Sequence, residues 1–355
     1  MLAAHHPIQR HPRAKLLAAD SEGVLRHIPR ANFPSLLLPG DLVIANDAAT
    51  IPASLFGEHA GSGASIEARL AGRSSLDPGD VREFSAIVFG GGDFHLRTED
   101  RPVPPAMRPG DRLAFGALRG VVAAVLSHPR LIQLRFEGEP DEIWAGIARQ
   151  GRPIQYSHVT EPLALWDVWT PIAGPPVAFE PPSAGFAIDW QSQAAISGRE
   201  AAFATITHAA GISSTGDPQL DRLLPFDEPY RIPQATVDAI RRAREGSGRI
   251  IAVGTTVVRS LEHAASSGGC VRAGEGVARQ RLGPESVLRV VDAILSGTHE
   301  PGTSHYELLR AFTDDPTLRR MDDELNAHGY RTHEFGDSVF VERRERQVGA
   351  VVRAA

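Results

Sequence analysis

The stretch that decides the fold is 252–262, which reads Ala252-Val253-Gly254-Thr255-Thr256-Val257-Val258-Arg259-Ser260-Leu261-Glu262. The short apolar run Arg249–Val253 leads into it and predicts a buried strand. Beyond the glycine, apolar residues recur at helical spacing and predict a helix over Thr256–Ser266. A strand that passes through a glycine turn into a helix is typical of an α/β domain.

The turn in this stretch has the features of an anion site. Backbone N–H groups at the start of a helix attract negative charge, and the hydroxyls of Thr255 and Thr256 add donors. Without a second glycine or a lysine, it is neither a Walker loop nor a dinucleotide fingerprint. A plain capped helix is the alternative, in which Arg259 and Glu262, three residues apart, form a surface pair.

Helix and strand signals continue on both sides of the stretch. Asp41–Asn46 is a short apolar run after a Pro-Gly turn and predicts a buried strand. Pro233–Glu245 predicts a helix that ends at a glycine. Apolar residues spaced from Pro284 to Ile294 predict another helix, and Ser304 to Glu307 reads as a capping box that starts a third.

The middle of the chain has a different pattern, in which short strands alternate with Gly and Pro clusters. This predicts a small antiparallel barrel or sandwich with strands at Ala64–Leu70, Glu83–Phe89, Arg119–Leu126 and Leu131–Phe136. We therefore predict an α/β fold in which both ends of the chain, 1–56 and 150–342, form one domain. A β-barrel domain, 57–149, is inserted between them, and 343–355 is predicted to be a disordered tail.

Composition narrows the classes of protein. The 355 residues are 42% hydrophobic and carry a formal net charge of -6, so the chain lacks the strongly basic character of many nucleic-acid binders. A local arginine patch in an acidic protein still permits contact with tRNA. A single cysteine, Cys270, excludes an internal disulfide, and no stretch reads as a membrane span or a zinc motif. These features predict a cytoplasmic protein, with a monomer favoured.

Several motifs carry a resemblance to one family. Residues 252–262 match the Ala-Val-Gly-Thr-Thr-x-x-Arg-x-Leu-Glu signature of the S-adenosylmethionine:tRNA ribosyltransferase-isomerases of queuosine biosynthesis. Residues 39–47 resemble their Pro-Gly-Asp-Leu-Leu-Val-x-Asn-Asp motif, 182–185 their Pro-Thr-Ala-Gly and 335–337 their Tyr-Gly-Asp. Because these motifs keep the family's order across nearly the whole chain, the chain is identified as a divergent member.

The resemblance implies transferase and isomerase chemistry, with S-adenosylmethionine as a substrate and no permanently bound cofactor or metal. In this family the ribosyl group moves onto 7-aminomethyl-7-deazaguanine in the tRNA anticodon loop. Epoxyqueuosine forms, and adenine and methionine leave. The sulfonium acidifies the adjacent C5′ hydrogens, so a positioned base must remove one, and the departing adenine needs a proton.

Candidate residues follow from the matching positions. Glu228, His208 and His299 are the candidates for acid and base. The candidates for contacting S-adenosylmethionine are Asn46, Asp47, Gly254, Thr255, Thr256, Arg259 and Asp337. The glycine-threonine turn suits the methionyl carboxylate and suits the sulfonium poorly, since a helix N-terminus repels cations.

Each candidate also has an ordinary structural explanation. In these alternatives His208 ends a strand, His299 caps a helix, Glu228 is a surface carboxylate, and Asp47 and Asp337 hold turns.

Departures from the family pattern keep other functions open. Ala187 stands where the family has a histidine, and 223–228 replaces its His-x-Met-His-x-Glu while keeping only Glu228. Ala49 and Ser54 stand where arginines are usual. One alternative is a paralogue that uses S-adenosylmethionine with a non-tRNA acceptor. The other is a non-catalytic binding protein of the same fold.

Overall fold

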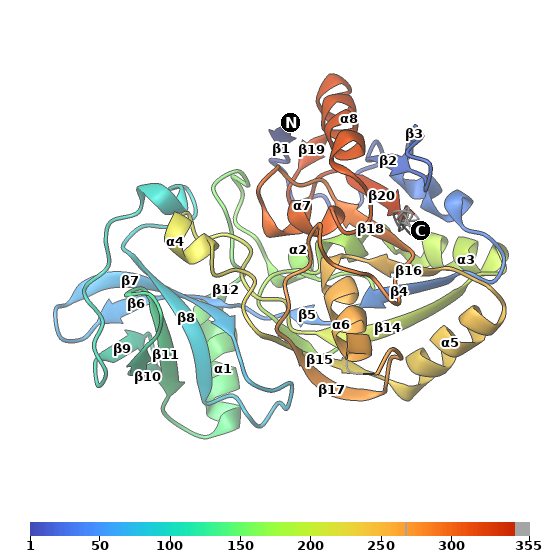
Figure 1. The fold of residues 1–355 in the computed structure, drawn as a ribbon. Helices are drawn as coiled ribbons and strands as arrows, with labels where there is room; N and C mark the ends of the chain where they lie inside the picture. The colour runs from blue at the N-terminus through green and yellow to red at the C-terminus, as the bar shows by residue number, and fades with distance from the viewer. Residues whose placement is uncertain (267, 345–355) are drawn as a thin grey trace, which may run out of the picture.

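A nine-stranded mixed sheet forms the larger part of the molecule, and the computed structural model describes residues 1–266 and 268–344 (Figure 1). Its four central strands, which are neighbours in the order β14, β4, β16 and β18, run parallel. From one edge to the other the sheet contains β17 (Gly274–Ala278), β15 (Glu228–Ile232), β14 (Ala202–His208), β4 (Leu42–Asn46), β16 (Ile250–Val253), β18 (Ala293–Gly297), β20 (Ser338–Glu342), β2 (Lys15–Ala19) and β3 (Leu25–Pro29).

Strand β4 shows why the sheet is buried on both faces. Successive side chains of a strand point to opposite faces. Leu42 and Ile44 pack into one core with residues of several helices, whereas Val43 and Ala45 pack into a second core on the other face. All four side chains are fully buried, which explains why this strand reads as a continuous apolar run.

Helices cover both faces of the sheet. The longest are α5 (Gln234–Glu245), α6 (Thr255–Ser266) and α8 (Asp315–Ala327), which pack in the first core, and α3 (Trp190–Gly198), which packs with the 3-10 helix η1 (Arg30–Leu36) in the second. The predicted helices over 233–245 and 256–266 are confirmed to within one residue at each end. The predicted third helix is α7 (Ser304–Leu309), whose N-cap is Thr303, one residue before the expected serine.

An inserted barrel, at the left in Figure 1, closes six antiparallel strands. They are β6 (Ser54–His59), β7 (Ala64–Gly72), β8 (Glu83–Gly90), β9 (Arg112–Phe115), β10 (Leu118–Val125) and β11 (Leu131–Phe136), and β6 pairs with β9 to close the ring. Helix α1 (Pro140–Gln150) packs on this core through Ile143 and Ile147. The four predicted strands and the α/β class with an inserted barrel are confirmed. The limits 57 and 149 remain a prediction.

The remaining elements are short. They are β1 (Leu2–Ala3), β5 (Ala49–Thr50), η2 (Thr98–Asp100), β12 (Gly151–Arg152), α2 (Leu165–Val168), β13 (Pro176–Ala178), η3 (Ser183–Ala187), α4 (Pro218–Asp221) and β19 (Arg331–Thr332).

The helix predicted from Pro284 to Ile294 is wrong. The segment is irregular up to strand β18, which begins at Ala293. The carboxylate of Glu262 on α6 accepts hydrogen bonds from the backbone N–H groups of Arg289, Val290 and Val291, at 2.7, 2.9 and 2.9 Å. The buried carboxylate thus accepts hydrogen bonds from N–H groups that would otherwise bond within a helix. Glu262 therefore does not form the surface pair with Arg259 that the sequence left open.

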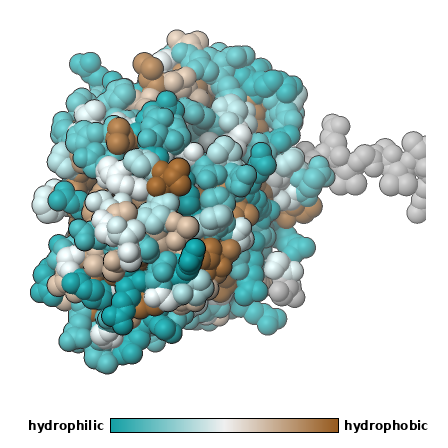
Figure 2. Space-filling view, turned by 90° about the vertical axis from the view of Figure 1, so that its left-hand side faces the viewer, coloured by the Kyte–Doolittle hydropathy of each residue, from teal (hydrophilic) through white to brown (hydrophobic). Residues whose placement is uncertain are grey.

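The end of the described chain is anchored by ion pairs. Arg343 lies 2.8 Å from Asp292, and Arg344 lies 2.6 Å from Asp314, so the predicted disordered tail does not begin at 343. The rest of that tail, 345–355, lies outside the described residues. Among the helices that the structure describes, none is long and apolar enough to cross a membrane. Figure 2 views the barrel end, where hydrophobic residues lie in small groups among hydrophilic ones.

Candidate active site

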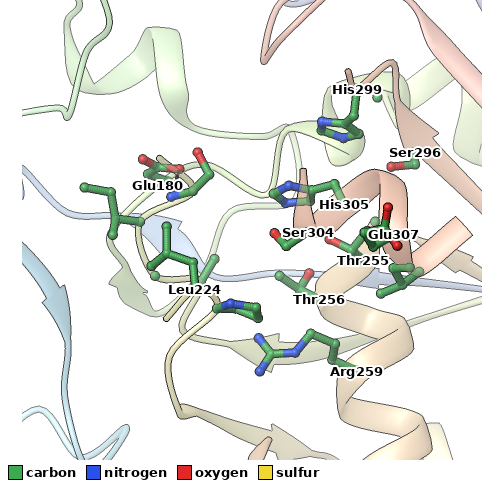
Figure 3. Close-up of a pocket in the computed structure, with 18 of the residues that line it drawn as sticks. Glu180, Leu224, Thr255, Thr256, Arg259, Ser296, His299, Ser304, His305 and Glu307 are labelled. Carbon is green, nitrogen blue, oxygen red and sulfur yellow. Dashed lines mark hydrogen bonds between the residues drawn. The ribbon is translucent and has the colours of Figure 1, made fainter. Parts of the chain in front are cut away.

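A cavity of about 610 Å³ opens at the carboxyl ends of the parallel strands. Gly254 follows β16, Gly297 ends β18, and Gly211 follows β14; all three line it. Ligands of open α/β sheets bind at this edge because the loops that leave the strands converge there. Figure 3 shows the side chains that surround the space, which come from α6, α7 and the segments around 180 and 224.

The predicted glycine-threonine turn, which leads into α6, forms part of the cavity wall. Gly254 has φ +92, a left-handed conformation that favours glycine, and its N–H donates to the carbonyl of Leu295 at 2.8 Å. Thr255 and Thr256 form the first turn of α6 and line the cavity. Since the first N–H groups of a helix have no partner within it, this turn offers donors to a ligand.

Glu228 lines the cavity and is held by three donors. It forms an ion pair with Arg259 Nη1, receives the ring Nε2–H of His208 at 2.8 Å, and accepts the N–H of Gly211 at 2.6 Å. The other ring nitrogen of His208 lies 2.7 Å from Ser260 Oγ. Sequence reasoning brought Glu228, His208 and Arg259 together as candidates, and the fold places them in contact.

These contacts determine the charge of Glu228. Burial would raise the pKa of its carboxyl, but Arg259, His208 and the Gly211 N–H together lower that pKa to about 2. Glu228 is therefore ionised at neutral pH and its oxygens are occupied, which suits it to hold Arg259 in place and makes it a weak proton acceptor. His208 is fully buried and does not line the cavity.

Three other predicted residues lie outside the cavity lining. The side chain of Asn46 accepts the N–H of His208 at 2.9 Å and donates to its carbonyl at 2.9 Å, which joins β4 to β14. Asp47 accepts the hydroxyls of Thr205 at 3.0 Å and Thr207 at 2.7 Å. Their contacts are internal to the sheet edge.

Asp337 also has an internal role. Its carboxylate accepts the backbone N–H of Lys15 at 2.7 Å and that of Arg331 at 2.8 Å. It therefore joins the start of β2 to the start of β19, as the turn-holding explanation expects.

His299 lines the cavity as one of a pair that the sequence did not reveal. Its ring stacks on that of His305, the second residue of α7, with centroids 4.4 Å apart and planes 12° apart (Figure 3). Burial is the main cause that lowers the pKa of both imidazoles, and for His299 the lowering is large. Both rings are neutral at pH 7. The capping box at Ser304 predicted that a helix starts here, but it did not predict which side of that helix lines the cavity.

Glu180 is a second cavity residue that sequence reasoning missed. It accepts the hydroxyl of Tyr156 at 2.5 Å and the N–H of Ser213 at 3.0 Å. Burial, reinforced by the nearby carboxylate of Glu334, raises its pKa to about 7. Its position two residues before the Pro-Ser-Ala-Gly motif at 182–185 was the available signal.

The fold also brings together two groups of side chains that could hold a metal ion. One consists of His27, Glu324 and His328, and the other of His158, His333 and Glu334, each with ligand atoms within 4.8 Å of one another. Their members lie far apart in the sequence, so motif spacing could not reveal them. Neither group lines the cavity.

The comparisons with known proteins agree with this fold. A family model described as Queuosine biosynthesis protein matches residues 1–341. The chain belongs to the queuosine biosynthesis protein family. The family identified from the motifs is thereby confirmed.

Relatives of this family match over nearly their whole length. The S-adenosylmethionine:tRNA ribosyltransferase-isomerase of Gloeobacter violaceus is 31% identical over 95% of this chain and 92% of its own. That of Citrifermentans bemidjiense is 31% identical over 96% of both chains. A crystal structure of S-adenosylmethionine tRNA ribosyltransferase from Thermotoga maritima shares the fold, with a TM-score of 0.51 and 23% identity over 96% of both chains.

Proposed function

We propose that this queuosine family protein transfers and isomerises the ribosyl moiety of S-adenosylmethionine onto 7-aminomethyl-7-deazaguanine in tRNA. The products are epoxyqueuosine, adenine and methionine. The observation that carries the proposal is the turn at Gly254, Thr255 and Thr256, which opens into a cavity of about 610 Å³ beside the Arg259–Glu228 pair. That volume is within the range of about 300–1,000 Å³ that is usual for small-molecule sites.

The turn supports binding of the methionyl end. The carboxylate of S-adenosylmethionine would lie at the N-terminus of α6, where backbone N–H groups and the hydroxyls of Thr255 and Thr256 are donors. Arg259, whose charge is paired with that of Glu228, lines the cavity on the same side. Because the sulfonium is repelled by this end, it would point across the cavity toward α7 and Glu180.

Glu180 supports release of adenine. With a pKa of about 7, its carboxyl holds a proton in a large fraction of molecules at neutral pH. It lies on the cavity wall, where it would protonate a ring nitrogen of the departing base. Glu228 is unsuited to this role because its pKa is about 2.

Two arginines support an anionic acceptor. Arg222 and Arg281 are exposed and line the cavity, and within the described part of the chain neither forms an ion pair. Unpaired guanidinium groups at the rim of a site are suited to phosphate oxygens. They give the acidic protein, with its net charge of -6, a local positive rim that a tRNA strand would contact.

The test is a reaction of the purified protein with S-adenosylmethionine and tRNA carrying the precursor base. We expect stoichiometric formation of adenine, measured by chromatography, and of epoxyqueuosine, measured by mass spectrometry of digested tRNA. The same tRNA with unmodified guanine is the control acceptor and should release no adenine.

The alternative acceptors are separate arms of this experiment. Adenine release with the free base or its nucleoside, but not with tRNA, would replace the tRNA assignment with a small acceptor. Binding of S-adenosylmethionine by calorimetry without adenine release on any arm would leave a non-catalytic binding protein.

A further inference from the structure

The proposed reaction needs a group that takes a proton from C5′ of S-adenosylmethionine, and most of the acidic side chains in the cavity are already engaged. Glu228 is held by Arg259 and His208. Glu307 accepts a hydrogen bond from Arg310 at 2.9 Å. Asp221 accepts the hydroxyl of Thr215 at 2.7 Å. A carboxylate whose lone pairs are in use is a weak base at neutral pH.

The two stacked histidines are different. His305 and His299 both line the cavity, and among the described residues no hydrogen bond or ion pair engages their ring nitrogens. The close-up shows His305 in the middle of the cavity, between Glu180 and the Ser304 end of α7, with His299 above it (Figure 3). Ring nitrogens without protein partners at a cavity surface can meet a substrate atom directly.

We propose that His305, stacked on His299, is the general base that removes a C5′ proton from S-adenosylmethionine, an inference that rests on the proposed function. The C5′–H bond breaks, and its electron pair stays on C5′, where the adjacent sulfonium stabilises it as an ylide. The proton passes to a ring nitrogen of His305. His299 is a positioning residue: its ring fixes the plane of His305.

The surroundings of His305 favour the neutral form of its imidazole. Burial lowers its pKa most, Glu228 and Glu334 oppose that effect, and Arg259 adds to it. For His299, burial acts first, and His305 and His333 lower its pKa further. A neutral imidazole with a free lone pair is the form that accepts a proton, so both rings are in the competent state at pH 7.

Other charged and titratable groups line the cavity with the pair or lie close enough to shift its pKa values. Those that line the cavity are Glu180 after β13, Asp221 and Arg222 of the α4 segment, Glu228 of β15, Arg259 of α6, Arg281 after β17 and Glu307 of α7. Those that act from outside its lining are His333 and Glu334, before β20. Of the carboxylates among them, Glu180 is the competing base, because its pKa of about 7 leaves it partly ionised.

The first test uses the unaltered protein. Its incubation with S-adenosylmethionine in D2O, without acceptor, should place deuterium at C5′, read by mass spectrometry. The exchange rate should fall on the acid side with a midpoint below 6.5, the ordinary histidine value, because the pKa of His305 is lowered. A midpoint near 7 would assign the base to Glu180 and overturn the proposal.

The second test uses His305→Gln and His305→Ala. Both should lower the exchange rate by about 100-fold or more, the usual contribution of a general base, and free imidazole should restore part of the rate in the alanine variant. The Kd for S-adenosylmethionine should change by no more than about threefold, because the base contributes to the reaction step. The control is His263→Gln, a histidine on α6 that contacts Tyr230 at 2.9 Å and lies outside the cavity lining.

The outcomes separate the two proposals. Exchange at C5′ without adenine release on tRNA would end the tRNA assignment and support the base. Turnover on tRNA with full exchange in His305→Gln would support the function and end the assignment of His305. If both variants fail to fold, the midpoint of the unaltered protein decides between His305 and Glu180.

Discussion

Glu228 is a carboxylate whose three partners come from different parts of the fold. Arg259 lies on α6, His208 ends β14, and Gly211 follows it in the next loop. Because these contacts are all within the protein, Glu228 stabilises the fold as well as lining the cavity. Its charge state therefore links the stability of the protein to pH.

Stability should fall in acid through this group. The pKa of Glu228 is about 2 in the folded protein against an ordinary 4.5, so ionised Glu228 favours the folded state above pH 4.5. That contribution, roughly 3 kcal/mol, should be lost progressively as pH falls from 4.5 toward 2. Urea unfolding across this pH range should show a steeper loss in the unaltered protein than in Glu228→Gln. Equal slopes would contradict the assignment.

Arg259→Lys and Arg249→Lys form a matched pair. Each arginine binds a buried carboxylate, Arg259 with Glu228 and Arg249 with Asp41, but only Arg259 lines the cavity. Both changes should lower the free energy of unfolding by about 1–3 kcal/mol, since a lysine cannot reproduce the forked contacts. Only Arg259→Lys should also weaken S-adenosylmethionine binding in calorimetry, by about tenfold or more. Equal affinity in the two variants would remove Arg259 from the site.

Gly254 sets the conformation of the turn between strand β16 and helix α6. A Cβ at Gly254 would lie 3.4 Å from Ala184 and would require a left-handed backbone, at φ +92. Gly110 has a similar φ of +93 with nothing near its missing Cβ, and it lies in the barrel. Gly254→Ala and Gly110→Ala should each cost about 1–2 kcal/mol in thermal unfolding. Only Gly254→Ala should reduce S-adenosylmethionine affinity, and a matching loss in Gly110→Ala would show a global effect.

The segment that Glu262 binds is the second test at this scale. Glu262→Ala would leave three buried or half-buried N–H groups, those of Arg289, Val290 and Val291, without their acceptor. We expect a loss of about 3 kcal/mol in urea unfolding, since an unpaired buried donor carries its full desolvation cost. Glu245→Ala, an exposed residue that ends α5, should change stability by less than about 0.5 kcal/mol. Similar values for both variants would refute this explanation of the irregular segment.

The same segment shows how far the sequence could predict elements. Local signals were sufficient for α5, α6 and β4, where apolar periodicity and turn residues agree with the packing. They failed over Pro284–Ile294 because Glu262, whose carboxylate fixes this segment, lies far from it in the sequence, on α6.

The residues of the site show the same limit. Gly254 and Thr256 were found from a local pattern, whereas Glu180 and His305 become cavity residues only through tertiary contacts.

At the scale of the whole molecule, one loop joins the barrel to the cavity. Ile212, Leu220 and Leu224 belong to the barrel core, and Ile212 and Leu224 also line the cavity. Asp217 caps α4 and lies 3.5 Å from both His128 and Arg130 of the barrel. The barrel therefore supports one wall of the site without contributing its own strands to the lining.

Weakening the contacts between this loop and the barrel should affect binding of the acceptor more than the rate of the chemical step. Asp217→Ala removes a helix cap, the ion pair with Arg130 and the contact with His128, with an expected cost of about 1 kcal/mol in thermal unfolding. It should raise the KM for tRNA more than it lowers kcat. Asp314→Ala, which removes the cap of α8 and an ion pair with Arg344 away from the cavity, should cost similar stability with unchanged KM. An unchanged KM in Asp217→Ala would remove the loop from acceptor binding.

The order of strands in the large sheet has a consequence for how the protein is made. Strand β20, Ser338–Glu342, lies between β18 and β2, so Lys15–Ala19 finds its parallel partner only near the other end of the chain. During translation, one edge of Lys15–Ala19 can pair at once with Leu25–Pro29, whereas the backbone groups of its other edge must wait for almost the entire polypeptide. The barrel has all of its strands in one continuous stretch and can complete itself in the meantime.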